Sequence, residues 1–200
     1  MESTRRLLTR GRRLEEATLA WNVLGIGVLS YSAIVAKSVA LAGFALDSLI
    51  EIGASVVVLW ELADVNVSRQ GRAMRMIGSA FVALSIYLAV QSTFVLVAGY
   101  RPHHSPLGVA WTAATAFVMF ALARAKAKTG DALNNPVLTT EGRVTLVDGV
   151  LALAVLVGLV LNMLAGWWWA DPTAGYVILY YAIREARVAL QSERREDDGL

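Results

Sequence analysis

The sequence predicts an all-α membrane protein with six transmembrane helices, and three observations predict this fold class. Hydrophobic residues make up 56% of the 200 residues, which is more than a soluble domain of this size contains. Apolar segments recur along the chain, each of about 20 residues, the length of helix that crosses roughly 30 Å of hydrocarbon. Basic residues gather in alternate connections between these segments. Because a helix satisfies its own backbone hydrogen bonds in lipid, we expect each apolar segment to be helical.

The first half of the chain predicts three helices, at about residues 17–36, 39–62 and 76–100. A basic and polar segment, residues 1–16, precedes them. No small-residue cleavage site follows a short apolar core there, so we do not expect a signal peptide. Lys37 and Ser38 form a very short break before the second helix. The longer break before the third helix carries Arg69, Arg72 and Arg75.

The second half predicts three more helices, at about residues 107–123, 141–165 and 173–190. A tight turn at residues 101–106 precedes the fourth helix. A longer connection is predicted at residues 129–140, where several residues interrupt helices. These residues are Gly130, Asn134, Asn135 and Pro136. The charged tail at residues 191–200 is expected to fray.

The distribution of basic residues predicts which side of the membrane each connection faces. The termini and the second-to-third and fourth-to-fifth connections hold nearly all the Arg and Lys, whereas the alternate connections hold Lys37 and Arg101. Since positively charged connections stay in the cytoplasm, we predict that both termini are cytoplasmic. Residues 1–16 are then a basic cytoplasmic segment, 17–190 a six-helix transmembrane domain and 191–200 a cytoplasmic tail. We expect a multi-pass protein of the cell (inner) membrane, in contact with the lipid bilayer.

The composition narrows the chemistry that the protein can perform. The chain has no cysteine, which removes disulfides, thiolate metal sites and cysteine nucleophiles. Its histidines, His103 and His104, are adjacent in one predicted connection, so a metal held within the membrane needs oxygen ligands. No stretch resembles a hydrolase triad, a phosphate-binding loop or a nucleic-acid-binding module. We therefore expect neither an enzyme nor a nucleic-acid partner.

Two carboxylates, Asp47 and Glu51, lie in the middle of the second predicted helix. Their four-residue spacing puts them on one face, one above the other. A charged side chain at that depth costs roughly 2.5–3.5 kcal/mol on insertion scales, so such residues usually have a partner. A bound cation is the partner that we expect. The alternative is a pair of acids hydrogen-bonded within a helix bundle.

The fifth predicted helix carries Glu141 and Asp148, which are seven residues apart and share a face. Glu141 is near the cytoplasmic end, where it could instead interact with the positive end of the helix dipole or pair with Arg143. Asp148 lies two turns deeper, where those explanations do not apply.

Three convergent carboxylates, or four with Glu141, describe an oxygen-rich site for a divalent cation. Without a cation these groups repel one another, which favours their protonated forms. One cluster could therefore exchange protons for a metal ion, which is the chemistry of an antiporter. Two alternatives stay open: a structural or regulatory membrane protein with a buried carboxylate network that does not transport, and a channel.

The two acidic segments resemble motifs of the cation diffusion facilitator family. Residues 38–51, SVALAGFALDSLIE, resemble its second transmembrane helix, with a pattern like G-S-x-A-L-x-A-D-x-x-x-D/H. Residues 137–149, VLTTEGRVTLVDG, resemble its fifth helix, S-x-A-L-x-A-D-x-x-H-x-x-x-D. Six helices with both termini in the cytoplasm also fit this family.

Position by position, the resemblance implies that Asp47, Glu51 and Asp148 are metal ligands. The histidine of the fifth-helix motif falls on Val144, which cannot bind a metal. Glu141 matches the aspartate of the preceding A-D-x-x-H segment and is the candidate for the missing ligand. Thr145 or a water molecule is the alternative.

The resemblance also implies a function and an assembly. Family members export Zn²⁺, Mn²⁺, Fe²⁺ or related ions in exchange for protons, as homodimers that work by alternating access. We therefore expect an efflux antiporter with Zn²⁺ as its metal, and Mn²⁺ or Fe²⁺ as alternatives. The chain ends soon after the sixth helix, so we expect a short branch without the family's C-terminal cytoplasmic domain. A homodimer would then form through the membrane helices.

Overall fold

The structure, a computed structural model, describes the backbone of residues 2–61, 67–134 and 136–197. It describes the side chains of residues 6–53, 55–56, 78–134, 138–139 and 141–188. The side chains of Arg69, Arg72 and Arg75 and those of the tail from residue 191 lie outside these ranges. The expected break up to residue 75 is wrong, because the backbone of these three arginines is already helical, in the segment Val67–Ala98.

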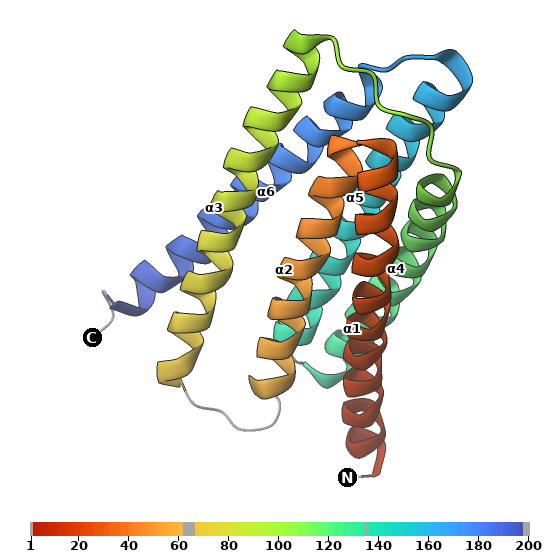
Figure 1. Ribbon diagram of the computed structural model, residues 1–200. Helices are drawn as coiled ribbons and strands as arrows, with labels where there is room; N and C mark the ends of the chain where they lie inside the picture. The colour runs from red at the N-terminus through yellow and green to blue at the C-terminus, as the bar shows by residue number, and fades with distance from the viewer. Residues whose placement is uncertain (1, 62–66, 135, 198–200) are drawn as a thin grey trace.

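The described part of the chain forms six helices joined by short connections, as Figure 1 shows. They are α1 (Glu2–Ala36), α2 (Val39–Glu61), α3 (Val67–Ala98), α4 (Pro106–Leu133), α5 (Pro136–Ala165) and α6 (Ala170–Asp197). No strand occurs in the ranges given above. The prediction of an all-α fold with six helices is confirmed. The basic segment before the first apolar stretch is continuous with α1.

The long connection predicted between the fourth and fifth helices is wrong. α4 continues to Leu133 and α5 begins at Pro136. Asn134 ends α4 in the left-handed conformation, with φ of 50°, and its backbone N–H donates to carbonyl groups of the last turn. Proline is well suited to the first turn of α5, where its missing N–H is no loss. A left-handed cap and a proline start therefore reverse the chain within two residues.

Gly130 is part of α4 and does not interrupt it. A Cβ added to Gly130 would lie 2.5 Å from Thr139 Oγ1, and one added to Gly142 would lie 2.9 Å from the backbone nitrogen of Ala127. Both glycines thus allow the backbones of α4 and α5 to approach closely. The sequence pattern suggested a helix breaker because it does not show which helix lies alongside.

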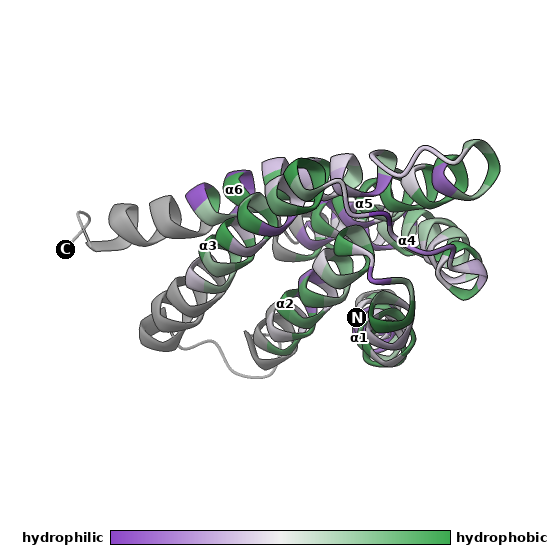
Figure 2. Ribbon diagram, turned by 45° about the horizontal axis from the view of Figure 1, so that its top comes forward, coloured by the Kyte–Doolittle hydropathy of each residue, from purple (hydrophilic) through white to green (hydrophobic). Residues whose placement is uncertain are grey.

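Four helices are long and apolar enough to cross a membrane, judged by length and composition over the described residues. The qualifying segments are Arg6–Ala36, Gly78–Ala98, Pro106–Leu133 and Glu141–Ala165. Large apolar side chains point away from the protein, among them Ile34 (76% exposed), Val97 (83%) and Leu164 (78%), as contact with lipid requires. Figure 2 shows hydrophobic residues over much of these helices. The crossing of the membrane by α2 and α6 and the cytoplasmic location of the termini stay predictions.

α2 lies within the bundle, in contact with α1, α3, α5 and α6 (Figure 1). Apolar side chains from these helices fill the core around it, each at most 1% exposed. They include Leu41, Phe44, Leu88, Val155 and Ile178. This packing brings the polar face of α2 against α5 and α6.

The first turn of α2 is bonded to the first turn of α6 through Asp171. The hydroxyl of Ser38 donates to one carboxylate oxygen of Asp171. The backbone N–H groups of Val39 and Ala40 lie 3.1 and 3.4 Å from the other oxygen. Asp171 is fully buried. A carboxylate is favourable at the N-terminus of a helix, so Asp171 fixes the start of α2 against α6.

Candidate metal centre

A small cavity between α2, α5 and α6 is lined by three of the sequence-predicted ligands, Asp47, Glu51 and Asp148. The cavity volume, counted as the space that the centre of a water-sized sphere can occupy, is about 20 Å³. This is enough for one water molecule or one cation. The remaining wall is formed by side chains of α3, α5 and α6. They are Phe81, Val144, Val147, Leu151, Tyr181, Ala182 and Glu185.

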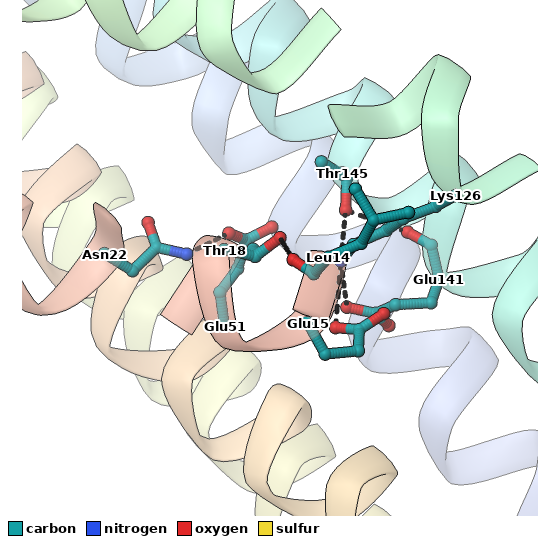
Figure 3. A network of polar contacts seen from close by, with 8 residues as sticks. All are labelled: Leu14, Glu15, Thr18, Asn22, Glu51, Lys126, Glu141 and Thr145. Atoms are coloured by element: carbon teal, nitrogen blue, oxygen red, sulfur yellow. Dashed lines mark hydrogen bonds and ion pairs between the residues drawn. The ribbon is translucent and has the colours of Figure 1, made fainter. Parts of the chain in front are cut away.

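The two carboxylates of α2 line the same side of the cavity, as their four-residue spacing predicts. Asp47 is 5% exposed and Glu51 is 7% exposed. The side-chain amide of Asn22 on α1 donates to Glu51 Oε2 at 2.8 Å (Figure 3). This bond orients Glu51 and leaves its other oxygen available to a ligand.

Asp148 of α5 is the most deeply buried carboxylate on the cavity wall, at 1% exposure. Neither of its oxygens has a partner in hydrogen-bonding geometry among the described residues, although the carboxyl group of Glu51 is near enough to share a proton with it. Buried polar groups are nearly always hydrogen-bonded, because burying one without a partner costs free energy. Asp148 therefore needs a proton or a bound cation.

The wall also holds Val144, at the position where the family resemblance expects an imidazole. Its isopropyl group supplies no ligand atom. Across the cavity, α6 contributes Glu185, a half-buried carboxylate that the sequence analysis missed. In the sequence, Glu185 stands between Arg184 and Arg187, and such a charged segment is typical of a solvated helix end. The helical spacing of Glu185 from Tyr181 and Ala182, four and three residues earlier, was the signal that it faces inward.

Glu141 belongs to a different cluster, centred on a buried lysine (Figure 3). The ammonium group of Lys126 on α4 lies 2.9 Å from Glu15 Oε2 and 3.5 Å from Glu141 Oε1. It also donates to Thr145 Oγ1 at 3.1 Å. The side chains of Lys126 and Glu15 are completely buried, and that of Glu141 is 10% exposed. One cation thus neutralises carboxylates from α1 and α5.

The sequence analysis missed this cluster because Lys126 stands among basic residues at the predicted end of the fourth helix. The signal was its place in a buried stripe of α4 with Met119, Ala123 and Gly130. Among the described ion pairs, the partner of Glu141 is Lys126 and not Arg143. Glu141 does not line the cavity that holds Asp148. Its role as a metal ligand stays a prediction.

The cavity brings carboxylates near one another without forming a closed coordination shell. Within the side chains that the structure describes, no three carboxylate, imidazole or thiol groups converge closely enough to hold one ion.

One comparison with known proteins finds a match that includes α5 and α6, two of the helices that form this cavity. A family model described as the cation efflux transmembrane domain matches residues 73–193, well over half of the chain. The matched range contains Asp148, Val144 and Glu185, whereas Asp47 and Glu51 precede it. No curated protein sequence matches the chain. The two carboxylates of α2 are therefore connected to the site by their geometry.

Proposed function

This chain belongs to the cation efflux family, and we propose that it exports a divalent metal cation in exchange for protons through the cavity between α2, α5 and α6. The expected membership of this family is confirmed, and the matched range contains the second of the two acidic segments. The protein is a cation efflux transporter and an integral multi-pass membrane protein, and the members of its family are transporters and not enzymes. Its metal, its coupling to protons and its location in the cell (inner) membrane are part of the proposal.

The observation that carries the proposal is the environment of Asp148. Its buried carboxylate has no hydrogen-bond partner in the described part of the chain and lines a cavity with Asp47 and Glu51. A buried charge without compensation is costly. A divalent cation compensates several carboxylates at once, and protons compensate them when the cation has left. This supports an exchange of one for the other.

The exchange proceeds in two half-steps. A cation that enters from the cytoplasm binds the carboxylates and displaces the protons that they carry. After the cavity opens to the other side, protons bind the same oxygens and the cation leaves. Asn22 holds Glu51 toward α1 throughout, through the bond to Oε2.

The proposed ligands are Asp47, Glu51 and Asp148, and Glu141 is the sequence-based candidate for a fourth. Zn²⁺ is the transported ion that the resemblance implies, with Mn²⁺ and Fe²⁺ as alternatives, because carboxylate sites bind all three. A homodimer formed through the membrane helices is also proposed.

The alternative function is a structural or regulatory membrane protein with a buried carboxylate network. One observation favours it: Lys126 neutralises Glu15 and Glu141 without any metal. That cluster does not include Asp47 or Asp148, so it leaves the carboxylates of the cavity unexplained.

The test is transport by the purified protein in liposomes, with fluorescent reporters of metal and of pH inside. We expect metal flux accompanied by proton flux in the opposite direction. Asp148→Asn should lower both fluxes at least about tenfold, since loss of groups that support a metal site already costs 10–100-fold. Glu16→Gln is the matched control, because Glu16 is an exposed acid on α1 paired with Arg12. Wild-type flux in Asp148→Asn contradicts the proposal, and metal flux without proton flux indicates a channel.

A further inference from the structure

We propose that Glu185 of α6 completes the cation site opposite Val144, so that the site is built from oxygen ligands alone and takes hard divalent cations such as Mn²⁺. This inference rests on the proposed function. It differs from the expectation drawn from the sequence, in which Glu141 supplies the missing ligand.

The first argument is position. Glu185 lines the same cavity as Asp47, Glu51 and Asp148. α6 contacts both α2 and α5, so a carboxylate on its inner face is directed toward both helices that carry the other ligands.

The second argument is the attachment of α6 to α2. Asp171, in the first turn of α6, binds the N-terminus of α2, and both helices run in the same direction from that point. At 1.5 Å per residue, Glu185 lies about 21 Å along α6 from Asp171, and Glu51 about 18 Å along α2 from Val39. Since α6 is inclined to α2 (Figure 1), these lengths do not convert directly into depth, and the shared cavity lining is what brings Glu185 to the level of Asp47 and Glu51.

The third argument is an unpartnered group that points to a ligand. Both oxygens of Asp148 are buried on the cavity wall without a hydrogen-bond donor in the described ranges. Adding Glu185 makes four carboxylates around a space of about 20 Å³. A cation in that space would satisfy Asp148 and compensate the other carboxylates that line the cavity.

Glu141 is poorly placed for the same role. It is bound to Lys126, whose ammonium group is completely buried and also serves Glu15 and Thr145. Recruiting Glu141 to a metal would take one of two carboxylates from a buried ammonium, and uncompensated buried charge is costly. Glu185, in contrast, is half-buried and forms no ion pair among the described side chains.

The ligand set determines the class of cation. Imidazole favours Zn²⁺ and similar ions, whereas carboxylate and water ligands suit Mn²⁺ and other hard cations. Four carboxylates with Val144 in place of an imidazole therefore reduce the advantage of Zn²⁺ over Mn²⁺. Zn²⁺ can still bind, since its intrinsic affinity for oxygen ligands exceeds that of Mn²⁺.

The experiment measures Kd for Mn²⁺ and Zn²⁺ by calorimetry on the full chain in detergent. Glu185→Gln should raise the Kd for Mn²⁺ at least about tenfold, and Glu16→Gln, a control at an exposed acid of α1, should change it less than about threefold. Adding Val144→His to Glu185→Gln should restore binding and raise the preference for Zn²⁺ over Mn²⁺ at least about tenfold, because the new imidazole replaces the lost ligand. A purely electrostatic effect of Glu185 would not be rescued by a neutral imidazole.

Asp148→Asn separates this inference from the proposed function. If Asp148→Asn loses binding while the Kd of Glu185→Gln stays within threefold of wild type, the role of Glu185 is overturned. The transport proposal then still stands. Loss in Glu141→Gln but not in Glu185→Gln also overturns it. Unchanged binding in Asp148→Asn refutes the shared site. The metal-free unfolding temperature checks that each variant folds. If Glu185→Gln does not fold, Val144→His alone decides, and an unchanged ratio of the two Kd values overturns the inference.

Discussion

Replacing Lys126 by methionine should destabilise the protein by about 3–5 kcal/mol, the usual cost of removing one partner from a buried ion pair. The structure supports the upper part of this range. The lysine and Glu15 side chains are completely buried, Glu141 is 10% exposed, and the ammonium group contacts both acids. Without it, two carboxylates from different helices remain in the interior with no counter-charge. The loss should be smaller in acid, because protonated carboxyl groups need no cation.

The assay is reversible unfolding in mixed micelles of increasing denaturing detergent, followed by tryptophan fluorescence. Arg12→Ala is the control, since it removes an ion pair of almost the same length, 3.0 Å, whose side chains are 74% and 51% exposed. An exposed pair contributes at most about 1 kcal/mol, so this variant should unfold almost as wild type does. Converting Glu15 and Glu141 to glutamine in the Lys126→Met background should recover much of the lost stability. If Lys126→Met and Arg12→Ala lose similar amounts, the burial argument is refuted.

Three further perturbations have expected outcomes. Asp171→Ala removes the acceptor for the first N–H groups of α2 and should lower the free energy of unfolding by about 1–2 kcal/mol. Asp171→Asn keeps one acceptor oxygen and should lower it by less. Equal losses in the two variants would argue against capping. Gly130→Ala brings a Cβ to 2.5 Å from Thr139 Oγ1 and should destabilise by about 1–3 kcal/mol in the same assay, whereas Gly27→Ala, with no atom within 4 Å, should not. Metal affinity measured by calorimetry should weaken as the pH falls from about 7.5 to about 5.5, because carboxylate ligands must lose their protons to bind; a Kd independent of pH contradicts proton exchange.

The sequence was sufficient for features that depend on local pattern. Apolar segments of membrane-spanning length predicted six helices because a helix in lipid must be apolar wherever it lies in the bundle. The spacing of Asp47 and Glu51 predicted a shared face, since helical geometry is the same in every helix. Their pairing with Asp148 needed the family motifs as well, because no local pattern shows which helices are neighbours.

Features that depend on neighbouring helices could not be predicted in this way. Glycine is a residue type that often interrupts helices, so the sequence alone suggests a break at Gly130. Only the presence of Thr139 beside it explains why a glycine continues the helix there. The sequence suggests that Asp171 is part of a turn. It does not show the capping role, because the helix N-terminus that Asp171 caps lies 132 residues earlier in the chain. Glu185 and Lys126 each stand beside other charged residues, so composition places them at a solvated helix end. Burial is decided by packing.

The acidic residues of the bundle fall into two groups, those paired with a basic side chain and those without one. This difference distinguishes structural acids from candidate metal ligands better than the depth of their burial does. Glu15 and Glu141 share the ammonium group of Lys126 as a counter-charge, although Glu15 Oε1 is buried without a hydrogen-bond partner in the described ranges. Asp47 and Asp148 form no ion pair with any described basic side chain, although both are at least as buried as Glu141. A structural network is complete in the folded protein, whereas a transport site must be incomplete until its substrate arrives. A buried carboxylate without a protein counter-charge, as at Asp148, is therefore suited to binding a transported cation, whereas the carboxylate of Glu141 is already compensated by Lys126.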